Sequence, residues 1–292
     1  MTKISRLILL SLLISLTFQL SACKKKETSL SAQPARVSAT KAYEHFFGPA
    51  PTTDKGTCYA FVIYFPSAKE RGKVVPFPFF TFDEASIKKV AVERLIGGME
   101  TGSYKGEFLS LFPSGTHLLA LDEAGGKVTL RFSKEMEKAP SDAASAKALS
   151  SALALTVGQF AGVKEVRMQI EGQKGETVCL VLPESEAVLQ PGSPRLLSIT
   201  AMKEKGAKDV EEVDAFFDRP VDIKELILTD KQGKTFEGDV YHSVFDMAAV
   251  LKPKDPSIFT AGMPVKVRWK LMDKMGRTAH GEEEFALEVK EH

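Results

Sequence analysis

The sequence lacks most of the patterns by which an enzyme or a nucleic-acid-binding protein is recognised. Its 39 basic and 38 acidic residues give a net charge of only +1, whereas nucleic-acid-binding domains usually carry a clear basic excess. Phosphate-binding loops, the Gly-x-Ser-x-Gly elbow, Cys-x-x-Cys and His-Glu-x-x-His are all missing, and the five histidines are scattered. We therefore expect no enzyme activity, no cofactor, no metal and no nucleic-acid partner.

The chain also lacks an apolar run long enough to cross a membrane, because a spanning helix needs about 20 apolar residues. Its apolar run near the start, Leu7 to Leu20, is shorter and follows two positive charges, Lys3 and Arg6. This layout is typical of a secretory signal. The four residues Leu20-Ser21-Ala22-Cys23 that end the segment resemble the lipobox of bacterial lipoproteins.

The lipobox resemblance implies cleavage before Cys23 and attachment of lipid to its sulfur and new amino group. Several acyl chains on one residue make a stable anchor, whereas a single chain holds only marginally. Lys24, rather than Asp, follows the cysteine, which favours the periplasmic face of an outer membrane if the host has two membranes, and otherwise the outer face of the plasma membrane. The alternative is an ordinary cleaved signal with an incidental cysteine.

Removal of residues 1–22 leaves 270 residues with 37 basic and 38 acidic side chains, a length that favours two domains. Residues 23–54 are rich in Lys, Ser, Ala, Thr and Pro and are predicted to be a flexible tether, with a short helix as an option at Tyr43–Phe47. The first domain is expected at 55–190 and the second at 191–292.

Cysteine is scarce, since only Cys58 and Cys179 remain once Cys23 is acylated. An exported protein meets oxidising conditions, in which such a pair can form a disulfide. Two buried free thiols are the equal alternative, because free cysteine packs as a small hydrophobe.

The first domain alternates helical and strand patterns, which indicates an α/β or α+β fold. Helices are predicted at 85–96 and 143–160. Strands are predicted at 59–65, 117–121, 127–132, 163–170 and 177–182.

Four blocks of this domain resemble the GerMN domain, a module named from a spore-germination protein, in their order and spacing: Ala91–Ile96, Phe112–Thr116, Gly126–Glu135 and Gln159–Val166. The resemblance covers about residues 56–183. It implies an exported binding or assembly module with a GerMN-like α/β sandwich and no catalytic residues to transfer.

The second domain has six strand-like stretches, at 195–202, 210–217, 223–229, 235–240, 265–272 and 284–289, which favours an immunoglobulin-like β-sandwich and hence an α+β chain overall. Phe217–Val221 and Ala261–Trp269 resemble CopC-type copper-resistance sandwiches. That family usually places a copper-binding histidine where this chain has Arg277, so the resemblance implies the shape without the metal site. Trp269 is expected to be core.

An aromatic stretch from Val74 to Phe82 contains two prolines and several phenylalanines. One interpretation is a strand folded into the core. The other is an apolar partner surface formed by Phe77, Phe79 and Phe80, since exposed patches of this kind mark interaction sites.

The sequence therefore predicts a non-catalytic envelope lipoprotein, anchored in a membrane, whose two modules bind an envelope protein or a cell-wall component. Two alternatives remain open. One is a cell-wall or small-ligand enzyme with its site at the domain interface, and the other is a metal-binding sandwich protein.

Overall fold

The computed structural model describes residues 35–53, 56–99, 104–173 and 177–292, which belong to one compact unit. Two separate hydrophobic cores divide this unit into a first lobe, residues 35–190, and a second lobe, residues 191–292. Among the described residues, no helix combines the length and the apolar character that a membrane span requires.

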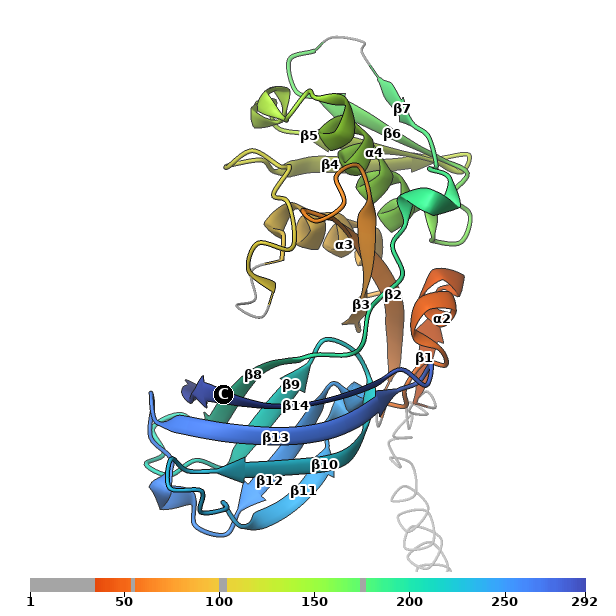
Figure 1. Ribbon diagram of the computed structural model, residues 1–292. Coiled ribbons are helices and arrows are strands. Elements are labelled where there is room, and N and C mark those ends of the chain that lie inside the picture. Colours follow the sequence, from red (N-terminus) through yellow and green to blue (C-terminus); the bar gives the residue numbers. More distant parts are fainter. Residues whose placement is uncertain (1–34, 54–55, 100–103, 174–176) are drawn as a thin grey trace, which may run out of the picture. The chain divides into compact units, whose positions relative to one another are not determined.

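The first lobe is built from two sheets and the helices packed against them (Figure 1). Its helices and strands are β1 (Arg36–Ala39), α2 (Lys41–Phe47), β2 (Thr57–Pro66), β3 (Val74–Thr81), α3 (Ile87–Gly97), β4 (Leu118–Ala124), β5 (Lys127–Phe132), α4 (Ala143–Gly158), β6 (Glu165–Ile170) and β7 (Val178–Leu180). One sheet has the order β1-β2-β3 and the other β4-β5-β6-β7. β5 and β6 are parallel, with α4 as the crossover between them.

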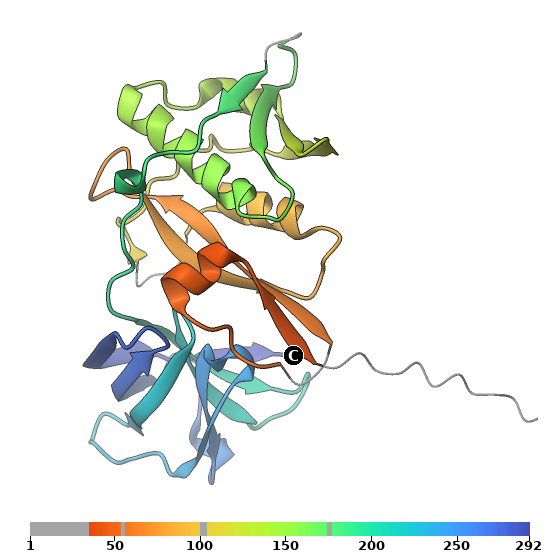
Figure 2. The ribbon, with the colours of Figure 1, turned by 90° about the vertical axis from the view of Figure 1, so that its right-hand side faces the viewer.

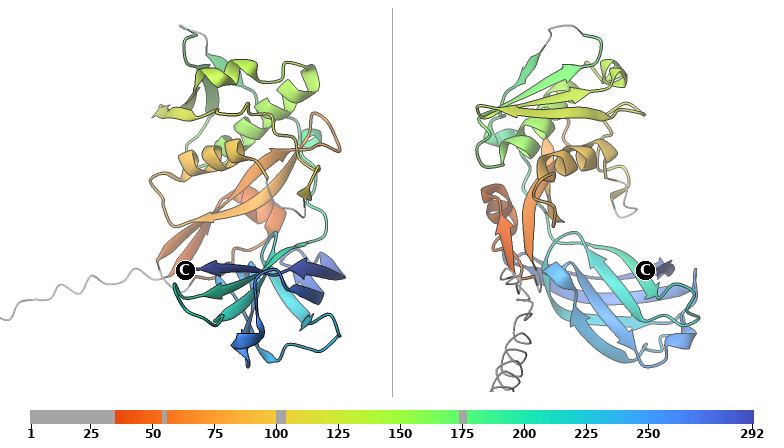
Figure 3. Two further views of the ribbon diagram at one scale, coloured as in Figure 1. Left: turned by 90° about the vertical axis from the view of Figure 1, so that its left-hand side faces the viewer. Right: turned by 180° about the vertical axis from the view of Figure 1, so that it is seen from behind.

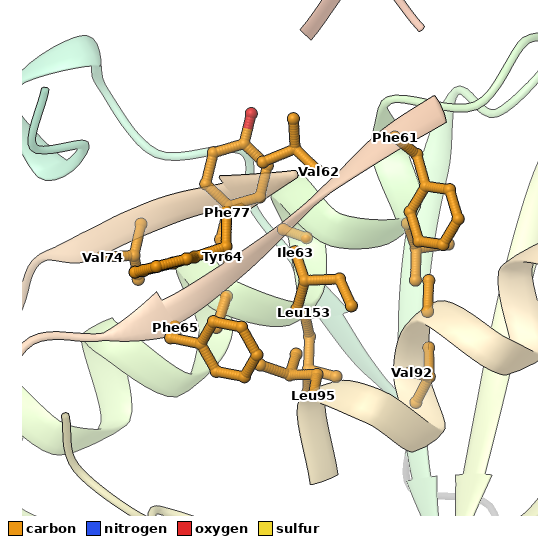
Figure 4. Close-up of a cluster of buried hydrophobic side chains, with 14 of the residues drawn as sticks. Phe61, Val62, Ile63, Tyr64, Phe65, Val74, Phe77, Val92, Leu95 and Leu153 are labelled. Atoms are coloured by element: carbon orange, nitrogen blue, oxygen red, sulfur yellow. The ribbon is translucent and has the colours of Figure 1, made fainter. Parts of the chain in front are cut away.

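Strand β2 is buried on both faces, which explains its nearly continuous apolar sequence. Figure 4 shows Ile63 and Phe65 on the side of β2 that faces Leu95 of α3 and Leu153 of α4. The opposite face is covered by α2, where the ring of Phe46 lies 6.1 Å from that of Tyr64. β2 is therefore the centre of the first core.

Part of β2 obtains its hydrogen bonds from helix α4 instead of from a strand. β1 pairs with β2 only as far as Ala60. Beyond it, the amide of Val62 donates to Gln159 Oε1 (2.9 Å) and its carbonyl accepts from Gln159 Nε2 (2.6 Å). The amide of Tyr64 donates to Thr156 Oγ1 (3.1 Å). Buried backbone groups need such partners, so these side chains join the sheet to α4.

The aromatic stretch forms strand β3, which confirms the interpretation of a strand packed into the core. β3 is an edge strand whose only strand partner is β2, with one further backbone bond from the amide of Leu189 to the carbonyl of Val74 (2.9 Å). Pro76 and Pro78 are two residues apart, so the positions that lack an N–H fall on the same side of the strand. An edge strand tolerates proline when that side has no strand partner.

The second lobe is a β-sandwich (Figure 3). Its strands are β8 (Leu196–Lys203), β9 (Glu212–Phe217), β10 (Val221–Thr229), β11 (Gly238–His242), β12 (Ala248–Pro253), β13 (Pro264–Asp273), β14 (Thr278–Ala286) and β15 (Glu288–Glu291). A three-stranded sheet, β10-β13-β14, packs against a five-stranded sheet, β11-β12-β9-β8-β15. The α+β class and the sandwich expected from the sequence are both observed. β12 was not predicted.

Trp269 lies in the sandwich core, as expected. It pairs with Gly281 of β14, and a Cβ at Gly281 would overlap the indole ring. The glycine therefore leaves the space that the tryptophan occupies.

The prediction of a flexible tether over residues 23–54 is wrong for residues 36–47. Strand β1 lies beside β2 and is followed by the short helix α2 (Figure 2). The side chains of Tyr43, Phe46 and Phe47 of α2 are buried. Thr40 caps the start of this helix, because its Oγ1 accepts a hydrogen bond from the amide of Tyr43. The helix spans Lys41–Phe47, which confirms the optional short helix at 43–47. Residues 23–34 lie outside the described residues.

We predict that Gln159→Leu lowers the free energy of unfolding by about 2–4 kcal/mol, because two buried backbone groups of Val62 lose their partner. Gln169→Leu is the matched control, since Gln169 makes only an exposed bond to Thr177, and should change it by less than about 0.5 kcal/mol. Urea unfolding measures both values. Equal effects would contradict the role assigned to Gln159.

Candidate functional site

Four charged side chains form a buried network at the end of the sandwich next to the first lobe. Asp218 and Arg219 follow β9, Asp273 ends β13, and Arg277 follows the next turn. The first three are 4%, 5% and 2% exposed. Arg219 contacts both oxygens of Asp218 (3.1 and 2.8 Å) and lies 3.5 Å from Asp273 Oδ2. Arg277 Nε donates to that same oxygen (2.6 Å), so two acidic and two basic groups balance.

The network extends into the first lobe through three contacts. The hydroxyl of Tyr104 donates to Asp218 Oδ2 (2.6 Å). Arg277 Nη2 donates to the carbonyl of Phe46 (2.8 Å), and the guanidinium of Arg219 lies over the ring of Phe47, 5.7 Å from its centroid. Burial, followed by the charge of Asp218, raises the pKa of Tyr104. The phenol therefore stays protonated and remains a donor at neutral pH.

A second ion pair between the lobes, formed by Arg195 and Glu107, lies nearer the surface than the buried network. Arg195 contacts both oxygens of Glu107 (2.6 and 3.2 Å) and lies over the ring of Tyr104, 4.9 Å from its centroid. Lys69 also contacts Glu107 (2.8 Å). The hydrogen bonds from Arg195 are the main cause that lowers the pKa of the Glu107 carboxyl. Two-point pairing of this kind fixes orientation as well as distance.

These residues border a groove of about 560 Å³ at the junction. The first lobe contributes Lys69, Phe77 and Glu107, and the second contributes Arg195 and Asp218. The wall between them is the connecting segment 189–194, which runs from the first lobe to the start of β8 (Figure 2).

The chemistry of the groove is suited to recognition. Its carboxylates Glu107 and Asp218 are held by arginine and tyrosine donors, and Glu70 is paired with Lys73. Strong donors of this kind hold the carboxylates in fixed positions. The groove thus combines an aromatic floor with a charged, ordered rim.

The comparisons with known proteins concern mainly the first lobe. Residues 62–176 match the family model Germane, described as sporulation and spore germination. This match lies within the first lobe and covers less than half of the chain. The family match and the expected GerMN resemblance refer to the same part of the chain, and this expectation is confirmed.

Solved structures similar to the chain include the first GerMN domain of the sporulation protein GerM from Bacillus subtilis, with 21% identity, a TM-score of 0.33 and coverage of 44% of this chain and 94% of that one. The tandem GerMN domains of the same protein give 17% identity, a TM-score of 0.34 and coverage of 61% and 58%. CopC from Methylosinus trichosporium OB3b gives 15% identity, a TM-score of 0.23 and coverage of 32% and 89%. Curated proteins give no significant match.

The expected partner surface at Phe77, Phe79 and Phe80 is wrong for Phe77 and is partly covered at the other two. Phe77 is 7% exposed and packs on Tyr104, with ring centroids 5.2 Å apart. Phe79 lies beneath Arg94. Phe80 stacks on Phe245 of the second lobe at 4.7 Å. The first lobe uses these rings for packing.

The two cysteines are free thiols in different sheets, so the disulfide alternative is wrong. Cys58 is buried on β2, as the other alternative predicted, and its Sγ lies 3.4 Å from the carbonyl oxygen of Thr81. Cys179 is exposed on β7, which neither alternative anticipated. Cys23, the expected lipidation site, lies outside the described residues.

The sequence does not predict the buried network of charged side chains. Asp218, Arg219 and Arg277 were noted only for the resemblance to CopC-type sandwiches. The CopC resemblance drew attention to Arg277 because a histidine was expected there. Its guanidinium is instead bound to Asp273 and to the first lobe. Within the described residues, no group of three or more His, Cys, Asp or Glu side chains could hold a metal ion.

We predict that Tyr104→Phe lowers the free energy of unfolding by about 1.5–3 kcal/mol, because a buried hydrogen bond to a charged group is lost. Tyr241→Phe is the matched control, since its hydroxyl makes a bond of equal length to Glu212 at the surface. We expect a change below about 1 kcal/mol there. Guanidinium unfolding tests both, and a smaller loss for Tyr104→Phe than for the control would refute the assignment.

Proposed function

We propose that the protein is a non-catalytic lipoprotein of the cell envelope, whose Germane domain and β-sandwich together bind a protein or cell-wall component. The lipobox-like sequence ending in Cys23 supports the anchor. The Germane match supports a module of the sporulation and germination type.

The junction groove is the observation that carries the binding proposal. Its walls come from both lobes, and the buried network beside it links those lobes through side-chain and backbone contacts. A surface ordered before its partner arrives loses less conformational entropy on binding. We therefore assign the groove as the partner surface of the two modules.

The groove also favours this proposal over the two alternatives. An interface enzyme would place an unpaired, perturbed carboxylate or histidine in the groove, but Glu107 and Asp218 are paired there. A CopC-like copper carrier would use the turn position of Arg277, whose guanidinium is engaged by Asp273 and Phe46.

Labelling of cells with radioactive palmitate tests the anchor. We expect label in the protein, recovery with membranes and loss of both in Cys23→Ala, because that sulfur carries the lipid. Cys58→Ala is the control and should keep the label, since Cys58 is buried in the first lobe. A mature chain that starts elsewhere without added lipid mass would refute the anchor.

Photo-crosslinking in intact cells tests the groove. A photoreactive phenylalanine at Gln190, an exposed residue of the groove wall, should give a discrete covalent adduct, because a bound partner lies within reach. The same residue at Lys254, exposed on the sandwich away from the groove, should give none. Identical adduct patterns at both positions, or none at Gln190, would argue against the groove as the binding surface.

A further inference from the structure

A second cavity, of about 580 Å³, lies over the outer face of the five-stranded sheet. Strands β9 and β11 and the turn that follows β11 contribute the side chains that matter for its chemistry, which are Glu212, Asp214, Tyr241, His242, Phe245 and Asp246. Tyr241 and Asp214 both pair with Val250 of the intervening strand β12, so they share one row across the sheet. None of these residues belongs to the junction groove.

Asp214 is the unusual member of this cavity. It is 7% exposed, and its Oδ1 is buried with no hydrogen-bond partner among the described residues. Burial, and then the charge of Glu212, raises the pKa of Asp214 to about 6. An unpartnered buried carboxylate is costly to a fold, and here it lines a cavity large enough for a ligand.

The other charges around the cavity leave a negative excess. Lys274 neutralises Asp246 (3.0 Å) and also contacts Asp222 (2.6 Å), while His242 lies 3.7 Å from Asp246. Glu212 accepts a hydrogen bond from the neutral hydroxyl of Tyr241 (2.6 Å). Glu212 and Asp214 are therefore the carboxylates of the cavity that have no cationic partner among the described residues.

Aromatic rings complete the walls. Tyr241 and Phe245 line the cavity, and Phe245 is held by parallel stacking on Phe80. Phe245 and Asp246 have φ of 67° and 54°, which are uncommon values for residues with side chains. Carboxylates beside aromatic faces attract organic cations both by charge and by the ring quadrupole.

We propose that this cavity binds an alkylammonium group, with Asp214 as the counter-ion and Glu212, Tyr241 and Phe245 around it. The acidic and histidine side chains of the described residues do not converge closely enough for a metal ion, whereas an extended amine reaches separated carboxylates. The ammonium comes either from a free polyamine or from a lysine side chain. This inference does not depend on the lipid anchor or on the junction groove.

Calorimetric titration of the intact protein at pH 7.5 tests the proposal with three probes: spermidine, N-acetyl-lysine amide and the neutral N-acetyl-norleucine amide. We expect one-site binding of at least one amine and none of the norleucine compound. Tighter binding of spermidine identifies a free polyamine as the ligand class, and tighter binding of the lysine compound identifies a side chain. Absence of amine binding, or equal binding of the norleucine compound, overturns the proposal.

Asp214→Asn should weaken amine binding at least tenfold, while Glu237→Gln, which alters an exposed pair with Lys254, should leave it unchanged. Asp214→Asn removes an unpartnered charge, so its unfolding midpoint at pH 7.5 should equal or exceed that of the parent, which excludes misfolding as the cause. Equal affinity in the parent and in Asp214→Asn overturns the proposal.

The affinity should also fall by about tenfold from pH 7.5 to pH 5, because a carboxyl of pKa about 6 is then mostly protonated. The other charged groups around the cavity are His242, which lies 3.7 Å from Asp246, and Lys274, which is paired with Asp246 and Asp222. Tyr241 stays neutral because its hydrogen bond to Glu212 raises its pKa to about 12. An affinity that does not change with pH would contradict the role of Asp214.

Discussion

The alternating salt bridges of Asp218, Arg219, Asp273 and Arg277 are the interaction on which the arrangement of the described chain depends. Three of these four side chains are buried. Burying charges carries a large desolvation cost, which is offset only when each charge has partners of good geometry. Those partners come from both lobes, because Asp218 needs Tyr104 and Arg277 needs the carbonyl of Phe46. Separation of the lobes would leave buried charges without these bonds, so the network favours one relative position.

This constraint connects the fold to the proposed role. The groove beside the network takes its aromatic side chains Phe77, Tyr104 and Phe108 from the first lobe and Arg195 from the segment before the sandwich. Neither lobe alone has both. The acidic cavity on the outer sheet face is different, since its charged groups come from the sandwich, while the first lobe contributes Thr52 and the ring of Phe80 that stacks on Phe245. The protein thus offers two surfaces of distinct chemistry.

The sequence predicted those parts of the fold that depend on local pattern. The helices at α3 and α4 follow from apolar spacing, and the position of Trp269 follows from an alternating strand. Prediction from the sequence failed where a segment is ordered by contacts with residues far away in the chain. The composition of residues 23–54 predicts a tether, yet pairing of β1 with β2 and packing of α2 order residues 36–47. Strand β12 has no alternation, because four consecutive residues are buried.

The candidate site could be predicted even less well, for the same reason. Tyr104 and Asp218 are 114 positions apart, and Arg277 and Phe46 are 231 apart. No spacing rule links such residues in a single sequence. Two signals were visible in the sequence, but neither indicated a junction. The pair Asp218-Arg219 lies in the stretch that resembles a CopC-type sandwich, and Arg277, in place of an expected histidine, indicated a lost metal site.

The most direct measurement is urea unfolding followed by two probes, one for each lobe. Trp269 is the only tryptophan and lies in the sandwich core, whereas the described α-helices all lie in the first lobe. If the buried network makes the lobes one cooperative unit, tryptophan fluorescence and helical circular dichroism will change at the same urea concentration. Two separated midpoints would contradict the account.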